Sequence, residues 1–147
     1  MKSFVRRGGL WVVAQGAFIA AIAVAPGKPL ALRNPGTMLL AAGAVMFVTA
    51  AANLGPSLSP LPEPAQDAEH IERGWYRLIR HPIYSGLILC AFGFSGATQS
   101  WSRFALALAL ALVLDAKSRD EERRLSARYP TYEAYVQRTK RFIPWLY

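Results

Sequence analysis

Two short segments of the sequence carry most of the side chains that could do chemistry. The first, residues 74–86, places two arginines, a histidine and two tyrosines around Pro82, where a run without charges begins. Proline is favoured at the first position of a helix, because its missing N–H would be unpaired there anyway. The free N–H groups of that helix start, beside Arg80 and His81, predict a site for a carboxylate or a phosphate.

Each of these residues taken singly also has a simpler role. Arg77 and Arg80 can be positive charges at a membrane–water interface. His81 can cap the helix, and Tyr84 can be a packed aromatic side chain. The whole string at the start of one apolar helix favours a functional site. A glycine at position 86 would then allow close approach of another helix or of a ligand.

The second segment, residues 117–125, is densely charged and continues an apolar run without a helix breaker. Lys117 and Glu121 are four residues apart and therefore share a helix face. Glu121 lies about a turn and a half past the apolar run and can look back into the mouth of a helix bundle. The other charged residues predict a solvated face with ion pairs: Arg119, Asp120, Arg123 and Arg124.

The chain then ends in a tail in which Tyr132, Tyr135 and Val136 follow helical spacing, after a break at Pro130. Packing is the expected role of these side chains. They would fold the tail back under the bundle as a cap.

Four apolar blocks must position these segments. The chain has 147 residues, 53% hydrophobic and 18% charged, and its apolar residues are concentrated at about 10–25, 37–54, 82–97 and 101–116. Each block is at the short end of the range for a helix that crosses a bilayer. A soluble chain would have too little polar surface to cover four of them. We therefore predict an all-α integral membrane bundle of four transmembrane helices, with a helical cytoplasmic C-terminal tail, as one domain over 1–147.

Two of these blocks have an alternative interpretation. Residues 104–114 alternate between small and large side chains, a period typical of a strand. Both kinds are apolar, however, and Ala and Leu are the strongest helix formers, so a helix is expected. The first block, between basic residues and Ala23-Val24-Ala25, is similar to a signal peptide. Pro26 would make a poor cleavage site, so we expect a retained helix.

Basic residues predict the orientation of the bundle. With both termini inside, 14 of the 17 Lys and Arg residues lie on the inner side and three on the outer side. This bias places both termini, the loop before residue 82 and the tail in the cytoplasm, in a membrane of the bacterial inner type. The pI near 10.2 is then explained by cytoplasmic loops and not by nucleic-acid binding.

Several classes of site have no support. The single cysteine, Cys90, excludes an intrachain disulfide and a cysteine-based zinc cluster. Only two histidines, His70 and His81, are present, so no metal site is expected. Glycine-rich phosphate loops are missing from the sequence. No charge lies in the middle of a predicted span, so an ion pathway is not supported.

The two segments and the tail together resemble the isoprenylcysteine carboxyl methyltransferase family, whose wider relatives are phospholipid N-methyltransferases. The resemblance rests on Arg80-His81-Pro82-x-Tyr84-x-Gly86, then Glu121-Glu122-x-x-Leu125, then Tyr132-x-x-Tyr135 and Arg141-x-x-Pro144. It covers residues 68–144, about half of the chain, and the first two spans carry no motif.

The resemblance implies a membrane-embedded methyltransferase that uses S-adenosylmethionine and takes a lipid-like or prenylated acceptor from the bilayer. It implies a cytoplasmic cofactor pocket built from the loop 65–81, the last spans and the tail 117–147. Carried over by position, the cofactor contacts are Ala68, Glu69, His70, Ile71, Tyr76, His81, Pro82, Ile83, Tyr84 and Glu121.

Two side chains are expected to serve the reaction itself. The family often has an arginine four residues before the first glutamate, which holds the acceptor. Lys117 stands there in this chain and keeps the charge but loses the bidentate fork. The usual Phe-Gly of the tail is Tyr129-Pro130 here, and both departures concern the acceptor. His81 is the candidate base for a thiol or amine acceptor, whereas a carboxylate acceptor would already be ionised.

The chemistry of these residues suits the cofactor. The helix start with His81 suits its carboxylate. Glu121 could take its ammonium or a ribose hydroxyl. Tyr76 or Tyr84 could pack on the adenine or face the sulfonium, since cations favour aromatic faces.

Two other functions stay open. Sterol reductases, which use NADPH, end in a similar tail, and this chain closes on Ile143-Pro144-Trp145-Leu146-Tyr147. A four-span accessory protein without catalysis, its basic tail on anionic lipids, is the other alternative. Cofactor binding separates the three.

Overall fold

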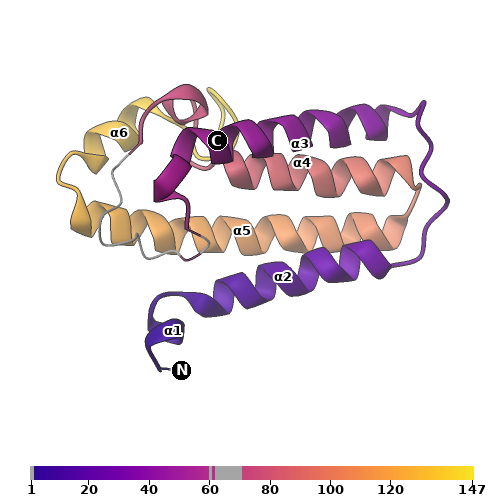
Figure 1. The fold of residues 1–147 in the computed structure, drawn as a ribbon, viewed down its shortest axis with the longest axis horizontal. Coiled ribbons are helices and arrows are strands. Elements are labelled where there is room, and N and C mark those ends of the chain that lie inside the picture. The colour runs from indigo at the N-terminus through magenta and orange to yellow at the C-terminus, as the bar shows by residue number, and fades with distance from the viewer. Residues whose placement is uncertain (1, 60, 62–70) are drawn as a thin grey trace.

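The computed structural model describes residues 2–59, 61 and 71–147. Four long helices form a bundle in which α3 packs on α4, α4 on α5 and α5 on α2 (Figure 1). Their bounds are Gly9–Val24 for α2, Pro35–Leu54 for α3, Pro82–Ala97 for α4 and Trp101–Arg128 for α5. The shorter elements are α1 (Lys2–Arg6), η1 (Gly55–Ser57), η2 (Gly74–Arg77) and α6 (Tyr132–Arg138). The described residues form no strand, which confirms the all-α prediction.

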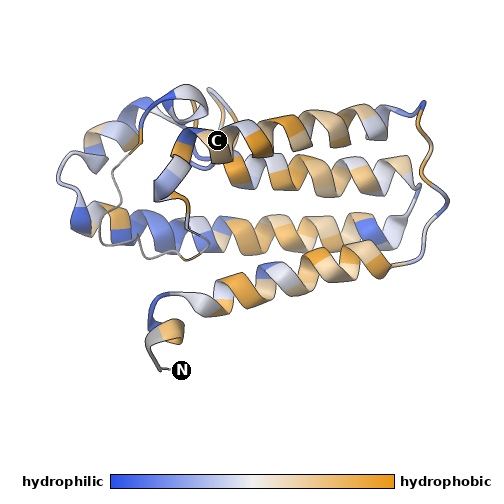
Figure 2. Ribbon diagram, viewed as in Figure 1, coloured by the Kyte–Doolittle hydropathy of each residue, from blue (hydrophilic) through white to orange (hydrophobic). Residues whose placement is uncertain are grey.

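Apolar and charged residues occupy different parts of the bundle (Figure 2). Helices α2, α3, α4 and the first half of α5 are apolar, whereas the second half of α5 and α6 are largely hydrophilic. Among the described helices, α3 with its extension to Ser57, 23 residues in all, is long and apolar enough to cross a membrane. Helices α2 and α4 are apolar but have 16 residues each. Four complete spans therefore stay a prediction.

The helix starts follow from local sequence signals. The Asn34 side chain accepts a hydrogen bond from the Gly36 N–H at 2.7 Å and caps α3. Ser100 caps α5 in the same way. Helix α4 begins at Pro82 with His81 as its N-cap residue, as the sequence predicts. Helix α5 runs without a break from Trp101 to Arg128, so the alternating segment 104–114 is helical.

Glycines allow α3 and α4 to pack backbone against backbone. A Cβ atom added at Gly93 would lie 2.3 Å from the backbone nitrogen of Leu40. One added at Gly43 would lie 2.7 Å from the nitrogen of Cys90. No side chain fits in that space, and small residues are what let membrane helices approach this closely. On the other side of α4, a core of apolar side chains joins α4 and α5 to α2: Ile22, Tyr84, Ala91, Ala107, Leu110 and Leu114.

We predict that Gly93→Ala lowers the free energy of unfolding in detergent by about 2 kcal/mol, because the new methyl group must push two backbones apart. Gly16→Ala is the matched control. A Cβ at Gly16 meets nothing within 4 Å, so the substitution should be neutral or stabilise α2 by up to about 1 kcal/mol. Equal unfolding midpoints for the two variants would contradict the close packing of α3 and α4.

Candidate functional site

A cavity of about 330 Å³ opens at the end of the bundle where α4 begins and the charged half of α5 passes. Its volume is at the lower end of the range for small-molecule sites. Side chains from α2, α3, α4, α5, η2 and α6 line it. Segments that are far apart in the sequence thus meet at one site.

The cavity brings together most of the side chains that the sequence predicts. The cofactor-binding candidates that line it are Ile71, Tyr76, His81, Ile83, Tyr84 and Glu121, and the acceptor candidate Lys117 joins them. Pro82 is buried at the start of α4 and is not part of the lining. Ala68, Glu69 and His70 lie outside the described residues. The functional roles of all these residues stay predictions.

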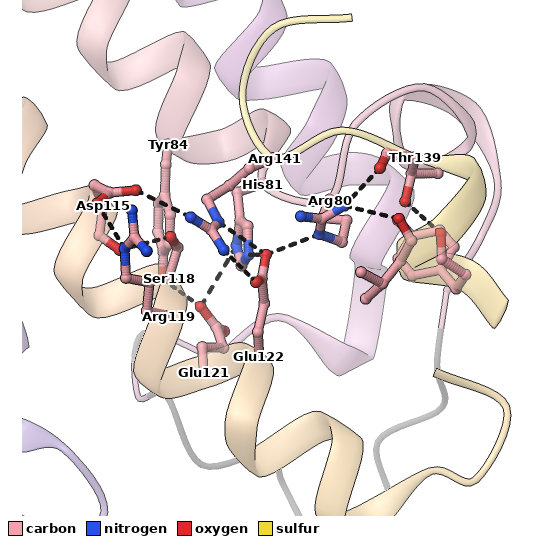
Figure 3. Close-up of polar contacts among 12 residues, drawn as sticks. Arg80, His81, Tyr84, Asp115, Ser118, Arg119, Glu121, Glu122, Thr139 and Arg141 are labelled. Atoms are coloured by element: carbon pink, nitrogen blue, oxygen red, sulfur yellow. Dashed lines mark hydrogen bonds and ion pairs between the residues drawn. The ribbon is translucent and has the colours of Figure 1, made fainter. Parts of the chain in front are cut away.

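The carboxylate of Glu122 holds three segments together beside the cavity (Figure 3). Arg80 Nε donates to Oε1 at 2.8 Å, and Arg141 donates to both oxygens at 3.1 and 2.7 Å. His81 Nε2 lies 3.2 Å from Oε1. Burial alone would raise the pKa of Glu122, but the hydrogen bonds from these partners outweigh it and hold that pKa well below its ordinary value.

His81 is buried between the two glutamates of the motif. Its Nδ1 lies 3.7 Å from Glu121 Oε2, opposite the contact of Nε2 with Glu122. Its ring stacks on that of Tyr84, with centroids 5.3 Å apart and planes inclined by 3°. Both ring nitrogens therefore face carboxylates within the protein. A base role for His81 would require one of these contacts to break.

Glu121 faces the cavity with one oxygen. Its Oε2 accepts a hydrogen bond from the Tyr84 hydroxyl at 2.9 Å. Among the described residues nothing bonds to Oε1, so this oxygen is available to a ligand. Burial raises the pKa of Glu121 above its ordinary value, although His81 and the Tyr84 hydroxyl act in the opposite direction.

Lys117 is 2% exposed and also lines the cavity, one helix turn before Glu121. Its Nζ donates to Gln15 Oε1 at 2.8 Å and lies 5.0 Å from the centre of the Tyr84 ring. Burial lowers the pKa of Lys117, and Glu121 partly opposes the shift. The Lys117 amine is thus a partly desolvated cation beside the Tyr84 ring, which lines the cavity.

The tail positions the start of α4. Residues 139–142 run parallel to residues 78–81: Arg80 N donates to Lys140 O at 2.8 Å, and His81 N to Arg141 O at 3.1 Å. The Ser85 hydroxyl donates to Phe142 O at 2.9 Å. Further along, the buried Tyr135 hydroxyl donates to Tyr76 O at 2.6 Å. The tail therefore caps the bundle as expected.

Sequence reasoning missed three residues of the site. Glu122 and Arg141 stood in the motifs without a role, and their pairing joins residues 19 apart across a turn of the chain. Gln15 is the one polar side chain of the first apolar block, and it meets a residue 102 positions later. A lone polar side chain in an apolar helix was the available signal, because such residues are costly unless paired.

Comparison with known proteins agrees with this arrangement. The model of the phospholipid methyltransferase family matches residues 32–131, which include α3, α4 and α5. The chain belongs to the phospholipid methyltransferase family. This family consists of membrane methyltransferases, so the resemblance read from the motifs is confirmed.

Two curated relatives match a shorter segment of this family member. The cobalt-zinc-cadmium resistance protein CzcN of Cupriavidus metallidurans is 39% identical over 77 residues, which are 52% of this chain and 36% of CzcN. The nickel-cobalt-cadmium resistance protein NccN of Alcaligenes xylosoxydans xylosoxydans is 35% identical over 82 residues, 55% of this chain and 38% of NccN. The matches thus span little more than a third of either relative.

We predict that substitutions of the two neighbouring glutamates differ in their effect on stability. Glu122→Gln should lower the free energy of unfolding by about 3 kcal/mol, because it leaves buried cations without their shared carboxylate. Glu121→Gln should change it by less than about 1 kcal/mol, because the amide keeps the Tyr84 contact and removes a charge that burial disfavours. Denaturant unfolding in detergent at neutral pH measures both.

The pH dependence of the stability gives a second test of the role of Glu122. Because the folded pKa of Glu122 is lowered, its stabilisation is present above the ordinary pKa of 4.5 and is lost as pH falls towards the folded value. The difference between the wild type and Glu122→Gln should therefore shrink in acid. A difference that grows in acid, or equal losses in the two variants, would contradict this account of Glu122.

Proposed function

We propose that this chain is an S-adenosylmethionine-dependent methyltransferase acting at a membrane on a lipid-like or prenylated acceptor, with the cofactor in the 330 Å³ cavity. One observation carries the proposal. A buried carboxylate, aromatic rings and a basic helix start converge on a single cavity, and these are the groups that the ammonium, the adenine and sulfonium, and the carboxylate of this cofactor require. Methyltransferases of this family typically use it.

Glu121 is the proposed partner of the ammonium group or of a ribose hydroxyl. Glu121 lines the cavity, and its Oε1 has no partner among the described residues, while Tyr84 donates to Oε2 at 2.9 Å. A charge-assisted hydrogen bond there is stronger than a neutral one, because the carboxylate is partly withdrawn from water.

The cofactor carboxylate is assigned to the start of α4. Arg80 lines the cavity, and its Nε and Nη1 are used by Glu122, Val136 O and Thr139 O. Its Nη2 has no partner among the described residues and is left for an anion. The unpaired N–H groups of the first turn of α4 add the positive end of the helix dipole.

Tyrosines supply the surface for the adenine and the sulfonium. The rings of Tyr76, Tyr132 and Tyr135 line the cavity. Burial raises the pKa of each of these phenols, so they stay neutral at physiological pH. Neutral aromatic faces attract cations and stack on planar bases.

The acceptor is assigned to the side of the cavity that faces the bundle. Phe47 of α3 and Ile83 of α4 give this side an apolar wall, which suits a lipid chain. Lys117, held by Gln15, would orient the acceptor head group. When bound, S-adenosylmethionine supplies an electrophilic methyl group, and transfer leaves S-adenosylhomocysteine. The protein's part is to align the two molecules and to exclude water.

The orientation of the bundle fits a cytoplasmic cofactor. The cavity lies at the end that carries α1, α6 and the charged half of α5 (Figure 1). This end holds 14 of the 17 basic residues. We propose that it faces the cytoplasm, with both termini, as the positive-inside rule requires.

The names of the two relatives refer to resistance to divalent metals. The described residues contain no group of three or more His, Cys, Asp or Glu side chains that could hold a metal ion. The proposal for this chain rests on its family and on its cavity.

We predict that the purified protein in detergent binds S-adenosylmethionine in calorimetry. Glu121→Gln should weaken binding about tenfold, the effect of one lost charge-assisted hydrogen bond. Acidification should also weaken it, and because the pKa of Glu121 is raised the loss begins above pH 4.5. NADPH is the control ligand. Binding of NADPH alone would favour a reductase, and no binding of either would favour an accessory protein.

We predict that Lys117 serves the acceptor and not the cofactor. Lys117→Met should leave the affinity for S-adenosylmethionine within about threefold, yet abolish transfer of a labelled methyl group into the lipid extract of membranes. Lys117→Arg is the matched control and should keep most of the transfer, because it keeps the charge. Unchanged transfer in Lys117→Met would refute this role.

A further inference from the structure

A second cavity lies in the other half of the bundle, away from Glu121 and Tyr84. It has a volume of about 190 Å³ and is lined by side chains of α2, α3, α4 and α5, among them Ile22, Leu40, Leu87 and Phe94. The lining is apolar apart from the thiol of Cys90. In a membrane protein, such a cavity suits a length of acyl chain and disfavours water.

Arg103, near the start of α5, contacts two residues that line this cavity, Phe94 and Ala23. Its guanidinium covers the ring of Phe94 at 4.3 Å, and its Nη2 donates a long hydrogen bond of 3.5 Å to Ala23 O. Phe94 and Ala23 also line the cavity, so the guanidinium borders the same space. The contact with Phe94 thus places a cation next to the apolar cavity.

The charge of Arg103 is not balanced within the described chain. The residue is only 8% exposed, and its buried Nε has no hydrogen-bond partner. A buried cation without a counter-charge is strongly unfavourable. The side chain therefore lacks the anion that its burial requires.

The surroundings of Arg103 supply only more positive charge. The loop 25–34 and the segment 98–103 form this end of the bundle (Figure 1), and they contain Lys28, Arg33 and Arg103 but no acidic residue. Lys28 Nζ donates to the amide oxygen of Gln99 at 2.5 Å, which brings no negative charge. Among the described residues, none at this end supplies a counter-charge.

We propose that an acidic phospholipid of the leaflet at this end binds here, with its phosphate at Arg103 and an acyl chain in the 190 Å³ cavity. A free anion would satisfy the guanidinium but leave the apolar cavity empty, whereas a phospholipid fills both. A net negative lipid is favoured over a zwitterionic one, because the segments at this end of the bundle contain three cations and no acidic residue. The site is separate from the cofactor cavity and does not rest on the proposed methyl transfer.

Native mass spectrometry of the detergent-purified chain tests the head group. With equal amounts of phosphatidylglycerol and phosphatidylcholine of matched acyl chains, the wild type should retain phosphatidylglycerol about tenfold more than phosphatidylcholine. Arg103→Gln should reduce the ratio to near one. Arg33→Gln, which removes the same charge from an exposed residue at the same end, should keep most of it. Equal retention by the wild type would overturn the proposal without any variant.

The thiol of Cys90 tests the acyl chain. It is the single cysteine of the chain and lines the cavity, so its alkylation by N-ethylmaleimide reports on occupancy. Phosphatidylglycerol should slow the reaction several-fold in the wild type and not in Arg103→Gln. Inorganic phosphate should have no effect. Equal rates with both lipids, or equal protection by inorganic phosphate, would overturn the assignment of a lipid.

Discussion

One carboxylate, that of Glu122, holds the end of the bundle beside the larger cavity together. It accepts hydrogen bonds from Arg80 before α4 and from Arg141 in the tail, and it contacts His81 at the start of α4. Two segments from distant parts of the sequence, residues 80–81 and the tail, are thereby fixed around one negative charge on α5. Because the pair partners are largely buried, neither the carboxylate nor the cations can be removed alone without leaving an uncompensated charge. The cavity beside this carboxylate exists because these segments stay in place.

Close packing of the helices determines which side chains the Glu122 carboxylate can contact. The glycines of α3 and α4 bring those helices into backbone contact, and the apolar core joins α4 and α5 to α2. Tyr84 belongs to that core and also donates a hydrogen bond to Glu121. One wall of the cavity, the Tyr84 side chain, is therefore part of the hydrophobic core. The two neighbouring glutamates then differ in chemistry. Hydrogen bonds from cations lower the pKa of Glu122, whereas burial raises that of Glu121. Glu122 is a structural anion, and Glu121 is the residue to which the proposal assigns a ligand.

The sequence predicted the local features well and the long-range pairings poorly. Helix starts at Pro82 and after Ser100 follow from capping and proline rules, and the placement of His81, Tyr84 and Glu121 around one cavity follows from the family motifs. The hydrogen bond of Gln15 to Lys117 could not be predicted, because it depends on which helix packs beside α5. The length of the apolar blocks predicted four membrane spans. Among the described helices, one is long and apolar enough by itself to cross a membrane.

Photo-crosslinking tests the central claim, that the cavity around Glu121 holds the cofactor, most directly. Methyl-labelled S-adenosylmethionine would be irradiated with the protein in detergent, and the labelled peptides would be mapped. The account predicts label on peptides that line the cavity, around Tyr76 or Tyr132, and markedly weaker labelling of Glu121→Gln at the same cofactor concentration. Label confined to other parts of the chain, or equal labelling of Glu121→Gln, would contradict it.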